Sequence, residues 1–472
     1  MTSQRIKLLI SILLPVTVLL LPISAFQIEG LTIVEQRVIA IFLMAALFWI
    51  LEPIPIYATS LLIIFLELIM VSTKGLKFII TPDSPEEFGT LISYKDIMHT
   101  FASPIIILFL GGFFLAMAAT KYRLDQNLAK VLLKPFGENP KWVMLGLMII
   151  TALFSMFMSN TATTAMMLSI LVPVLAVFLP GDKGKVAFTL AVPFAANVGG
   201  IGTPIGTPPN AVALKYLTGP DYISFGSWMA MALPYVIVLL LFAWGLLLLF
   251  YPISTPKIKL TITGSWLKNR KAYIVYATFG LTILLWLTDF IHGMNSYTVA
   301  MVPVAVFSAF GIINKNDLKN ISWDVLWLVS GGIALGLALE ASGLAERLVN
   351  TIPFGTFSPL IIIVSVTVIA MLMANFMSHT ATSNLILPLV AALGTSIMSL
   401  GPLGGNKMIV LATTISCSMS MALPISTPPN ALAFATGTLE TKQMAKPGVI
   451  IAIVGLILNY ALMYVLDIIG FF

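Results

Sequence analysis

The sequence carries little charge. Its 472 residues include 25 basic and 19 acidic side chains, 9% of the chain, where an ordinary soluble domain has roughly 25%. So few charges cannot cover the surface of a water-soluble globule. This scarcity excludes most soluble enzymes and nucleic-acid-binding proteins, even though the net charge is +6. In a membrane protein, such a basic excess instead orients the loops.

Several chemical signatures are also missing. The single cysteine, Cys417, excludes an intramolecular disulfide framework. The sequence has no G-x-x-x-x-G-K-[ST] motif, which argues against ATP-driven transport. No cluster of His, Cys, Asp and Glu has metal-ligand spacing, and no pair of aspartates in apolar segments indicates a membrane protease. We therefore expect neither an enzyme nor a cofactor, and no nucleic-acid partner.

What the chain does have is long apolar runs, with 59% hydrophobic residues and a mean hydropathy of +1.02. A membrane helix needs about 20 mostly apolar residues. Eleven segments meet this requirement: 6–26, 35–51, 55–73, 101–118, 186–218, 226–251, 272–290, 295–313, 323–339, 405–435 and 447–470. They predict an all-α polytopic membrane protein embedded in the lipid bilayer. Residues 141–180 and 357–400 are too long for one crossing and carry central polar clusters, which predicts two re-entrant helical hairpins.

Basic loops predict the orientation. Arg5 and Lys7 place the N-terminus in the cytoplasm. The run 8–23 that follows resembles a signal peptide, but Pro15 and Pro22 interrupt it and no clear cleavage site follows, so we favour an uncleaved first helix. The basic segments after the fourth and sixth spans then fall inside, and the acidic segment after the ninth falls outside. Eleven crossings put the C-terminus outside, and we expect a multi-pass plasma-membrane protein.

The chain contains an internal repeat. Three landmarks recur at a spacing of 219 or 220 residues: Ser159–Thr163 as Ser378–Thr382, Thr207–Asn210 as Thr427–Asn430, and Gly111-Gly112 as Gly331-Gly332. The segment that flanks the first hairpin is predicted to be cytoplasmic, and the segment that flanks the second is predicted to be external. The two copies are therefore predicted to be inverted relative to the membrane. Inverted repeats with broken helices are typical of secondary transporters, whose site lies near the midplane. The predicted organisation is an N-terminal helix at 1–34, repeats at 35–251 and 272–472, and a cytoplasmic linker at 252–271.

The repeated motifs are polar within otherwise apolar runs. The Ser-Asn-Thr type of tip offers hydroxyl, carboxamide and unpaired backbone groups. Helix N-termini favour a carboxylate, and carbonyls at helix C-termini favour a small cation. Paired prolines end a helix and free the carbonyls one turn earlier. Structural roles are the alternative, but four motifs in two related pairs favour a ligand site. The glycine pairs are expected to allow close helix packing.

His379 and Glu67 are two of the titratable residues within these apolar segments. His379 occupies the position in the second tip that Asn160 occupies in the first. A histidine in a polar cavity can be neutral or charged near physiological pH, or it can serve only as a structural hydrogen-bonding group. Glu67, in the third span, has no partner at helical spacing, although charges inside spans are costly.

The chain resembles the divalent anion/sodium symporter family over residues 35–470. The resemblance rests on the two tips, the two Thr-Pro-Pro-Asn breaks and the Trp-x-x-Glu-x-Ile-Pro segment Trp49–Pro55. The resemblance implies a homodimer with elevator-type motion and dicarboxylate, citrate or sulfate substrates. The family contains both sodium-coupled symporters and sodium-independent exchangers. The implied substrate-binding residues are Asn160, Thr161, Thr207, Pro208, Ser378, His379, Thr380, Thr427 and Pro428.

The resemblance also implies two cation sites. The first would use Ser155, Ser159, Asn160 and the Gly206 backbone, all of which can supply oxygens for one sodium ion. The second would use Ala374, Ser378, His379 and the Ser426 backbone. Here Ala374 has no side-chain oxygen where the symporters carry a threonine, and His379 replaces an asparagine, so this site does not fit sodium.

These observations favour a carrier for small dicarboxylates of the succinate, malate and 2-oxoglutarate class. A protonated His379 in place of the second sodium favours anion-for-anion exchange. The retained first cation site favours sodium symport, and proton coupling through His379 is a third possibility. An anion channel is the alternative of another class, but it needs no inverted repeat. A cation/proton antiporter would usually have an acidic residue at the site.

Overall fold

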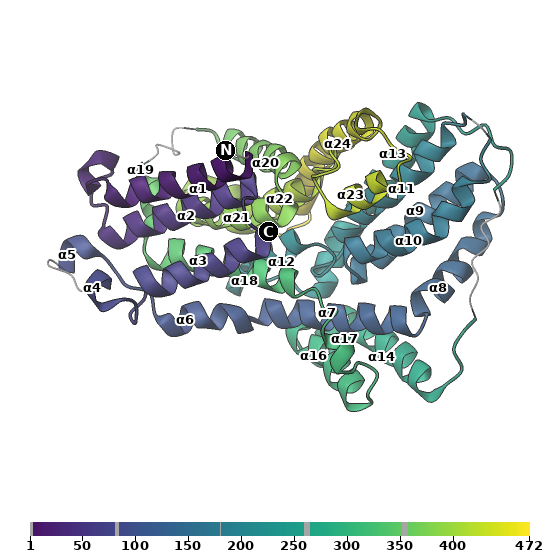
Figure 1. Cartoon of the computed structure of the whole chain (residues 1–472), viewed down its shortest axis with the longest axis horizontal. Helices are drawn as coiled ribbons and strands as arrows, with labels where there is room; N and C mark the ends of the chain where they lie inside the picture. Colours follow the sequence, from purple (N-terminus) through teal and green to yellow (C-terminus); the bar gives the residue numbers. More distant parts are fainter. Residues whose placement is uncertain (1–2, 81–84, 180, 259–264, 352–356) are drawn as a thin grey trace.

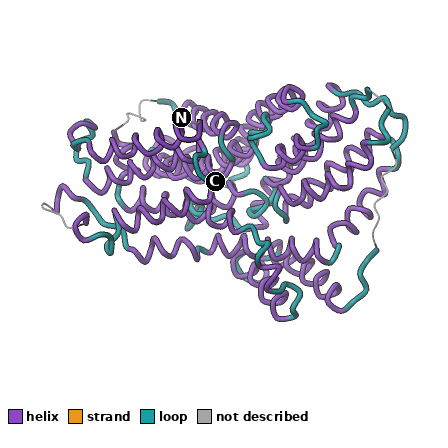
Figure 2. The backbone as a smooth tube through the Cα atoms, viewed as in Figure 1, coloured by secondary structure: helices purple, strands orange, loops and turns teal. Residues whose placement is uncertain are grey.

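The computed structural model describes residues 3–80, 85–179, 181–258, 265–351 and 357–472. These residues form helices joined by loops, and no β-strand occurs among them, apart from one isolated bridge between Ser72 and Ile92. Figure 2 shows the helical trace. The all-α prediction is confirmed. Seven helical runs within the described ranges are long and apolar enough to cross a membrane.

Each of the eleven predicted spans contains a helix. These helices are α1 (Ser3–Leu20), α2 (Ile33–Leu51), α3 (Ile56–Met70), α7 (Pro104–Lys121), α11 (Gly184–Gly200), α13 (Phe225–Phe250), α14 (Arg270–Leu287), α16 (Ser296–Ala309), α18 (Trp323–Ala341), α22 (Gly405–Ser418) and α24 (Thr441–Ile468). Two of the predicted spans are broken: α12 (Pro208–Leu214) follows α11, and α23 (Pro428–Ala435) follows α22. Both breaks precede a proline pair, where the ring cannot continue a helix from the preceding turn.

The two long polar-centred segments each form a helix pair. The first contains α9 (Pro140–Phe157) and α10 (Asn160–Leu175), and the second contains α20 (Pro359–Phe376) and α21 (His379–Ser396). The connecting elements are η1 (Ile23–Phe26), α4 (Lys77–Ile80), α5 (Pro85–Phe88), α6 (Tyr94–His99), η2 (Thr100–Ala102), α8 (Leu124–Leu133), η3 (Lys134–Phe136), η4 (Gly219–Asp221), α15 (Asp289–His292), α17 (Lys315–Leu318), α19 (Leu344–Thr351) and η6 (Met398–Leu403).

The helices gather into two groups joined along α7. In Figure 1, α1, α2 and α3 lie at the left, α8 to α11 lie at the right, and α7 runs between them above α14 and α16. The glycine pairs allow close crossings, as expected. Gly111 lies against Ala300 of α16, and Gly331 lies against Ser60 of α3, so a Cβ at either position would collide with the neighbouring helix.

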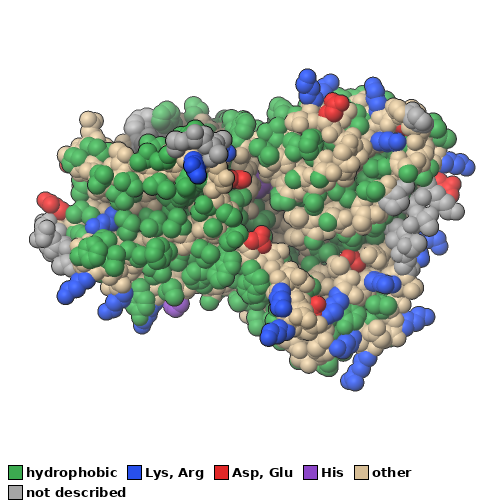
Figure 3. Space-filling view, viewed as in Figure 1, with side chains coloured by type: hydrophobic (Ala, Val, Ile, Leu, Met, Phe, Trp, Pro, Cys, Tyr) green, Lys and Arg blue, Asp and Glu red, His purple; other side chains and the backbone are tan. Residues whose placement is uncertain are grey.

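Apolar side chains also cover much of the outside. Figure 3 shows hydrophobic side chains across the face, while many lysines and arginines lie toward its ends. Leu249 and Phe376 are 74% and 67% exposed on their helices. A soluble monomer rarely exposes such broad apolar surface, but lipid tails would cover it in a bilayer.

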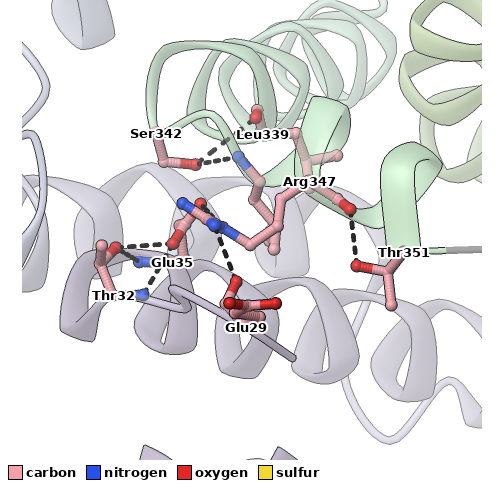
Figure 4. Close-up of polar contacts among 8 residues, drawn as sticks. Glu29, Thr32, Glu35, Leu339, Ser342, Arg347 and Thr351 are labelled. Carbon is pink, nitrogen blue, oxygen red and sulfur yellow. Dashed lines mark hydrogen bonds and ion pairs between the residues drawn. The ribbon is translucent and has the colours of Figure 1, made fainter. Parts of the chain in front are cut away.

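Arg347 ties α19 to the start of α2 (Figure 4). Its Nε lies 2.7 Å from Glu35 Oε1, and its Nη1 donates to the Glu29 carbonyl at 3.0 Å. The Glu35 side chain is 1% exposed and completes a capping box with Thr32. The Arg347 side chain is 31% exposed, so solvent screens part of this interaction. The pair therefore holds together two segments that are 312 residues apart.

Candidate functional site

The two hairpin tips are built alike. Each chain reversal ends at a serine that caps the returning helix: Ser159 Oγ accepts from the Ala162 N–H at 3.2 Å, and Ser378 Oγ accepts from the Ala381 N–H at 3.1 Å. A serine N-cap satisfies only one of the free N–H groups of the first turn. The remaining donors and the positive end of the helix dipole therefore face the tip.

The two unwound loops are also anchored alike. The Asn210 carboxamide donates to three backbone carbonyls of the first loop at 2.8–3.2 Å. Asn430 donates to two carbonyls of the second loop at 2.9 and 3.0 Å. These carbonyls lie where the chain leaves α11 and α22 and unwinds before the next short helix. The asparagine of each Thr-Pro-Pro-Asn motif thus holds its own loop open.

Tips and loops meet around one cavity of about 360 Å³. All nine residues that the resemblance implied for substrate binding line it: Asn160, Thr161, Thr207, Pro208, Ser378, His379, Thr380, Thr427 and Pro428. Ser159 and Gly206 also line it, whereas Ser155 lies behind Asn160 and contacts it. Residues separated by more than 200 positions in the sequence therefore share one site.

The first tip is rich in oxygen atoms. One end of the Asn160 carboxamide faces the Ser155 hydroxyl and the carbonyls of Ala196 and Gly206. With its nitrogen there, Asn160 donates to these carbonyls at 3.3 and 3.0 Å. If the carboxamide oxygen occupied this position instead, it would converge with the Ser155 hydroxyl and the two carbonyls. Four oxygens arranged in this way suit a small cation. The Ser155 hydroxyl also donates to the Ala196 carbonyl at 2.8 Å.

The second tip has a different donor set. His379 Nε2 lies 2.5 Å from the Ser420 carbonyl, and because a carbonyl only accepts, this nitrogen carries the hydrogen. Ala374, which matches Ser155, is buried and offers no side-chain oxygen. The neighbouring Asn375 is occupied by backbone groups, donating to the Met371 carbonyl and accepting from the Ala422 N–H. This tip therefore presents an imidazole where the first presents oxygens.

Charge is scarce around the cavity. Among the described lining residues the only carboxylate is Asp324, which is exposed at the start of α18, and no lysine or arginine is present. A dianion inside such a cavity would need compensating positive charge, because burying unpaired charge is costly. The helix N-termini provide part of it as partial charge.

Some lining residues could not be expected from the sequence. Asn197 in α11 is buried, and its carboxamide donates to Thr427 Oγ1 at 3.2 Å and Asn430 Oδ1 at 3.1 Å, which links α11 to the second Thr-Pro-Pro-Asn motif. Tyr57, Phe109 and Phe113 supply apolar walls. None of these residues belongs to a repeated motif. A lone asparagine in an apolar run was the only available signal.

A second hollow of about 360 Å³ adjoins the cavity, because Phe113 and Ser159 line both. It leads from the first tip to Lys121 and Asp317, whose Nζ and Oδ2 lie 2.6 Å apart. Lys121 begins the basic segment that was predicted to be cytoplasmic. The site is therefore approached from that side of the protein in this conformation.

Comparisons with known proteins agree with these features. A model of a citrate transporter family matches residues 46–415. The sodium-dependent dicarboxylate transporter SdcS of Staphylococcus saprophyticus is 30% identical over 98% of this chain and 92% of its own length. SdcS of Staphylococcus aureus is 30% identical over 97% and 90%. The YdaH transporter structure of Alcanivorax borkumensis aligns over 88% of this chain and 98% of that chain, with 15% identity and a TM-score of 0.49.

Proposed function

This chain belongs to the citrate transporter family and is a multi-pass membrane transporter, and from that premise we propose that it carries small dicarboxylates of the succinate, malate and 2-oxoglutarate class. The single observation that supports this most is the convergence of two capped tips and two unwound loops on one cavity. Two helix N-termini that face one cavity suit a ligand with an anionic group at each end.

We assign one substrate carboxylate to each tip. Asn160 and Thr161 would hold the first, and Thr380 with the Thr427-Pro428 loop would hold the second. Thr161 and Thr380 lie in the first turns of α10 and α21, where their hydroxyls and backbone N–H groups line the cavity. Charge-assisted hydrogen bonds of this kind are stronger than neutral ones.

We further propose that transport is an exchange of one dicarboxylate for another, without sodium. A protonated His379 would compensate part of the substrate charge and remain with the protein after the substrate leaves. The empty carrier would then hold an unpaired buried charge, whose cost opposes its crossing. The loaded carrier would not pay that cost. Ser155 of the first tip is matched in the second tip by Ala374, which has no side-chain oxygen for a sodium ion. This difference supports the proposal.

Sodium-coupled symport is the second candidate, and a specific feature favours it. The oxygens around Asn160 would fit one sodium ion if the carboxamide turned its oxygen inward. The staphylococcal relatives are also named as sodium-dependent. Symport through this tip alone would need only one ion site.

Uptake of labelled succinate into proteoliposomes distinguishes these modes. Exchange predicts rapid uptake only into vesicles preloaded with a dicarboxylate, with no dependence on sodium. Strong sodium-driven uptake into empty vesicles would overturn exchange in favour of symport. Uptake driven by a proton gradient and lost in His379→Asn would indicate proton coupling. Non-saturable flux without counterflow would indicate an anion channel.

The wider architecture is proposed on the same grounds. We propose inverted repeats at 35–251 and 272–472, a homodimer with elevator-type motion, and a plasma-membrane location with a cytoplasmic N-terminus and an external C-terminus. In a Cys417→Ala background, Glu138→Cys should react only from the cytoplasm and Ala341→Cys only from outside. Both positions are exposed, so labelling of both from one side would contradict the inversion.

A further inference from the structure

Glu67 in the last turn of α3 has no evident structural role. Its side chain is fully buried, and neither carboxylate oxygen has a hydrogen-bond partner among the groups described. Neither of the two ion pairs found in the described part of the chain includes it. A carboxylate buried in a membrane-spanning helix without a partner is costly to ionise. The group is therefore placed to bind a proton.

Lys215 is the cation that acts on this carboxyl group. It directly follows α12, and its Nζ donates to the Ile333 carbonyl of α18 at 3.0 Å rather than forming an ion pair with Glu67. Gly336 makes this position available, because a Cβ there would collide with the Tyr216 hydroxyl and lie 2.6 Å from Lys215 Nζ. Lys215 is thus held by a neutral backbone carbonyl rather than by a carboxylate.

A cavity connects Lys215 with the surface. It has a volume of about 510 Å³ and is lined by the end of α12, by α18, by α21 and by the start of α22. Its rim carries Glu340 and Glu346, which are exposed. The Tyr216 hydroxyl lines it without a hydrogen-bond partner. Protons can therefore reach Lys215 from the side of the acidic segment that follows α18.

The other charged groups around α3 are occupied or exposed. On α2, Arg37 donates to the carbonyls of Met70 and Ile79, and Glu35 pairs with Arg347. On α18, Glu340 acts on Lys215. The charged or titratable residues of α6 are exposed at its surface: Lys95, Asp96 and His99. Burial is thus the main factor that keeps a proton on Glu67, and Lys215 is the charged group that opposes it.

Helix α12 connects this pair with the substrate cavity. It begins at Pro208, which lines that cavity, and ends at Leu214, next to Lys215. Seven helical residues span about 10 Å as a rigid element. A displacement of the Thr207-Pro208 loop would therefore move Lys215 toward Glu67 or away from it.

We propose that Glu67 is a proton-binding site controlled by Lys215 and reached through the cavity between α12, α18 and α21. With Lys215 on the Ile333 carbonyl, Glu67 holds a proton. When α12 brings Lys215 onto the carboxylate, the proton leaves through the cavity. The link to transport rests on the proposed dicarboxylate function, whereas the proton site itself does not.

The test uses the full-length protein and a hydrophobic carbodiimide, which reacts with protonated carboxyl groups in apolar surroundings. Mass spectrometry should find Glu67 modified, with a reactivity that falls as pH rises. Lys215→Met should move the midpoint of this fall upward by about one pH unit or more, because an opposite charge that favours ionisation is gone. Saturating succinate should change the reaction rate. Glu52, an exposed carboxylate at the end of α2, is the internal control.

Two outcomes would overturn the proton site: no modification of Glu67 at any pH, or a midpoint that Lys215→Met leaves unchanged.

In proteoliposomes, Glu67→Gln, which mimics the neutral acid, should keep succinate affinity but flatten the pH dependence of the transport rate. A normal pH profile in this variant would refute the link to transport. Succinate transport without Glu67 modification would refute the site alone, and modification without succinate transport would refute the substrate proposal alone.

Discussion

The two hairpin tips share a backbone plan but differ in chemistry. Both break at a capping serine, and both face a loop that an asparagine holds open. The first tip surrounds Asn160 with a hydroxyl and two carbonyls. The second gives His379 a single carbonyl partner, and Ala374 offers no oxygen. The shared plan locates a site for a ligand with two ends, and the difference points to how its charge is compensated.

The largest expected effect comes from making the second tip like the first. The double variant Ala374→Ser with His379→Asn restores a hydroxyl and a carboxamide and removes the ionisable ring. We expect exchange in preloaded vesicles to fall by about tenfold or more, which corresponds to about 1.4 kcal/mol, and sodium dependence to appear. Succinate flux with and without a sodium gradient measures both effects.

The single variant His379→Asn is the matched control for that experiment. It removes the ring without restoring the Ser155-like hydroxyl, so it should lose exchange without gaining sodium dependence. Unchanged exchange in both variants would mean that the histidine only anchors the tip to the Ser420 carbonyl, and the chemical contrast between the tips would lose its functional meaning.

The next largest effect is a loss of succinate affinity that should be equal at the two tips. Thr161→Ala and Thr380→Ala each remove one hydroxyl from the cavity, at matching positions of α10 and α21. Each should cost roughly 1.5–3 kcal/mol of binding, or about tenfold or more in succinate affinity. Equilibrium binding to purified protein measures this, and expression level and thermal stability serve as controls. Full affinity in both variants would contradict the site.

The sequence indicated which segments meet at this cavity because each of them repeats. Polar residues at the centre of the 141–180 and 357–400 segments indicated where the helices break, and the proline pairs indicated the loops. Asn197 could not be assigned, because it occurs once and its partners, Thr427 and Asn430, are brought next to α11 only by the fold. The roles of the Ser420 and Ala196 carbonyls could not be predicted either. Every residue has a carbonyl, and the direction in which it points depends on the fold.

Glu67 and Lys215 show the same limit for charged residues. The sequence identified Glu67 as a costly charge without a partner at helical spacing, and that description holds in the structure. Its controlling cation comes from a different helix, and no periodicity connects positions that are so far apart. The helical segments themselves were easier to predict, because apolar length is a local property.

A smaller effect should test the shared anchoring of the loops. Asn210→Ala removes a donor from three carbonyls, and those of Ile201 and Thr203 keep a second one. Asn430→Ala removes a donor from two carbonyls, and that of Leu423 keeps a second one. Each should lower the free energy of unfolding by about 1–3 kcal/mol, visible as a reduced melting temperature in detergent. Asn430→Ala should additionally free Asn197 and weaken succinate binding. A variant as stable as the parent protein would show that its loop needs no anchor.

The smallest expected effect concerns the hollow beside the first tip. Partial burial opposes ionisation of Asp317, but hydrogen bonds from Lys121 and from the Asn314 N–H outweigh it and lower the pKa of this carboxyl group. Because the pKa is lower in the folded state, the pair stabilises the protein above the usual value of about 3.9. That stabilisation is lost as the pH falls further, through the folded-state value.

The Lys121–Asp317 pair lies at the surface and both side chains are partly exposed, so Asp317→Asn should change the free energy of unfolding by less than about 1 kcal/mol at neutral pH. The difference between variant and parent should vanish in strongly acidic buffer and shrink in high salt. Because Lys121 lines the approach to the first tip, Lys121→Ala should weaken succinate uptake from the cytoplasmic side more than from the outside. Equal effects on the two sides would mean that the hollow is not a route to the site.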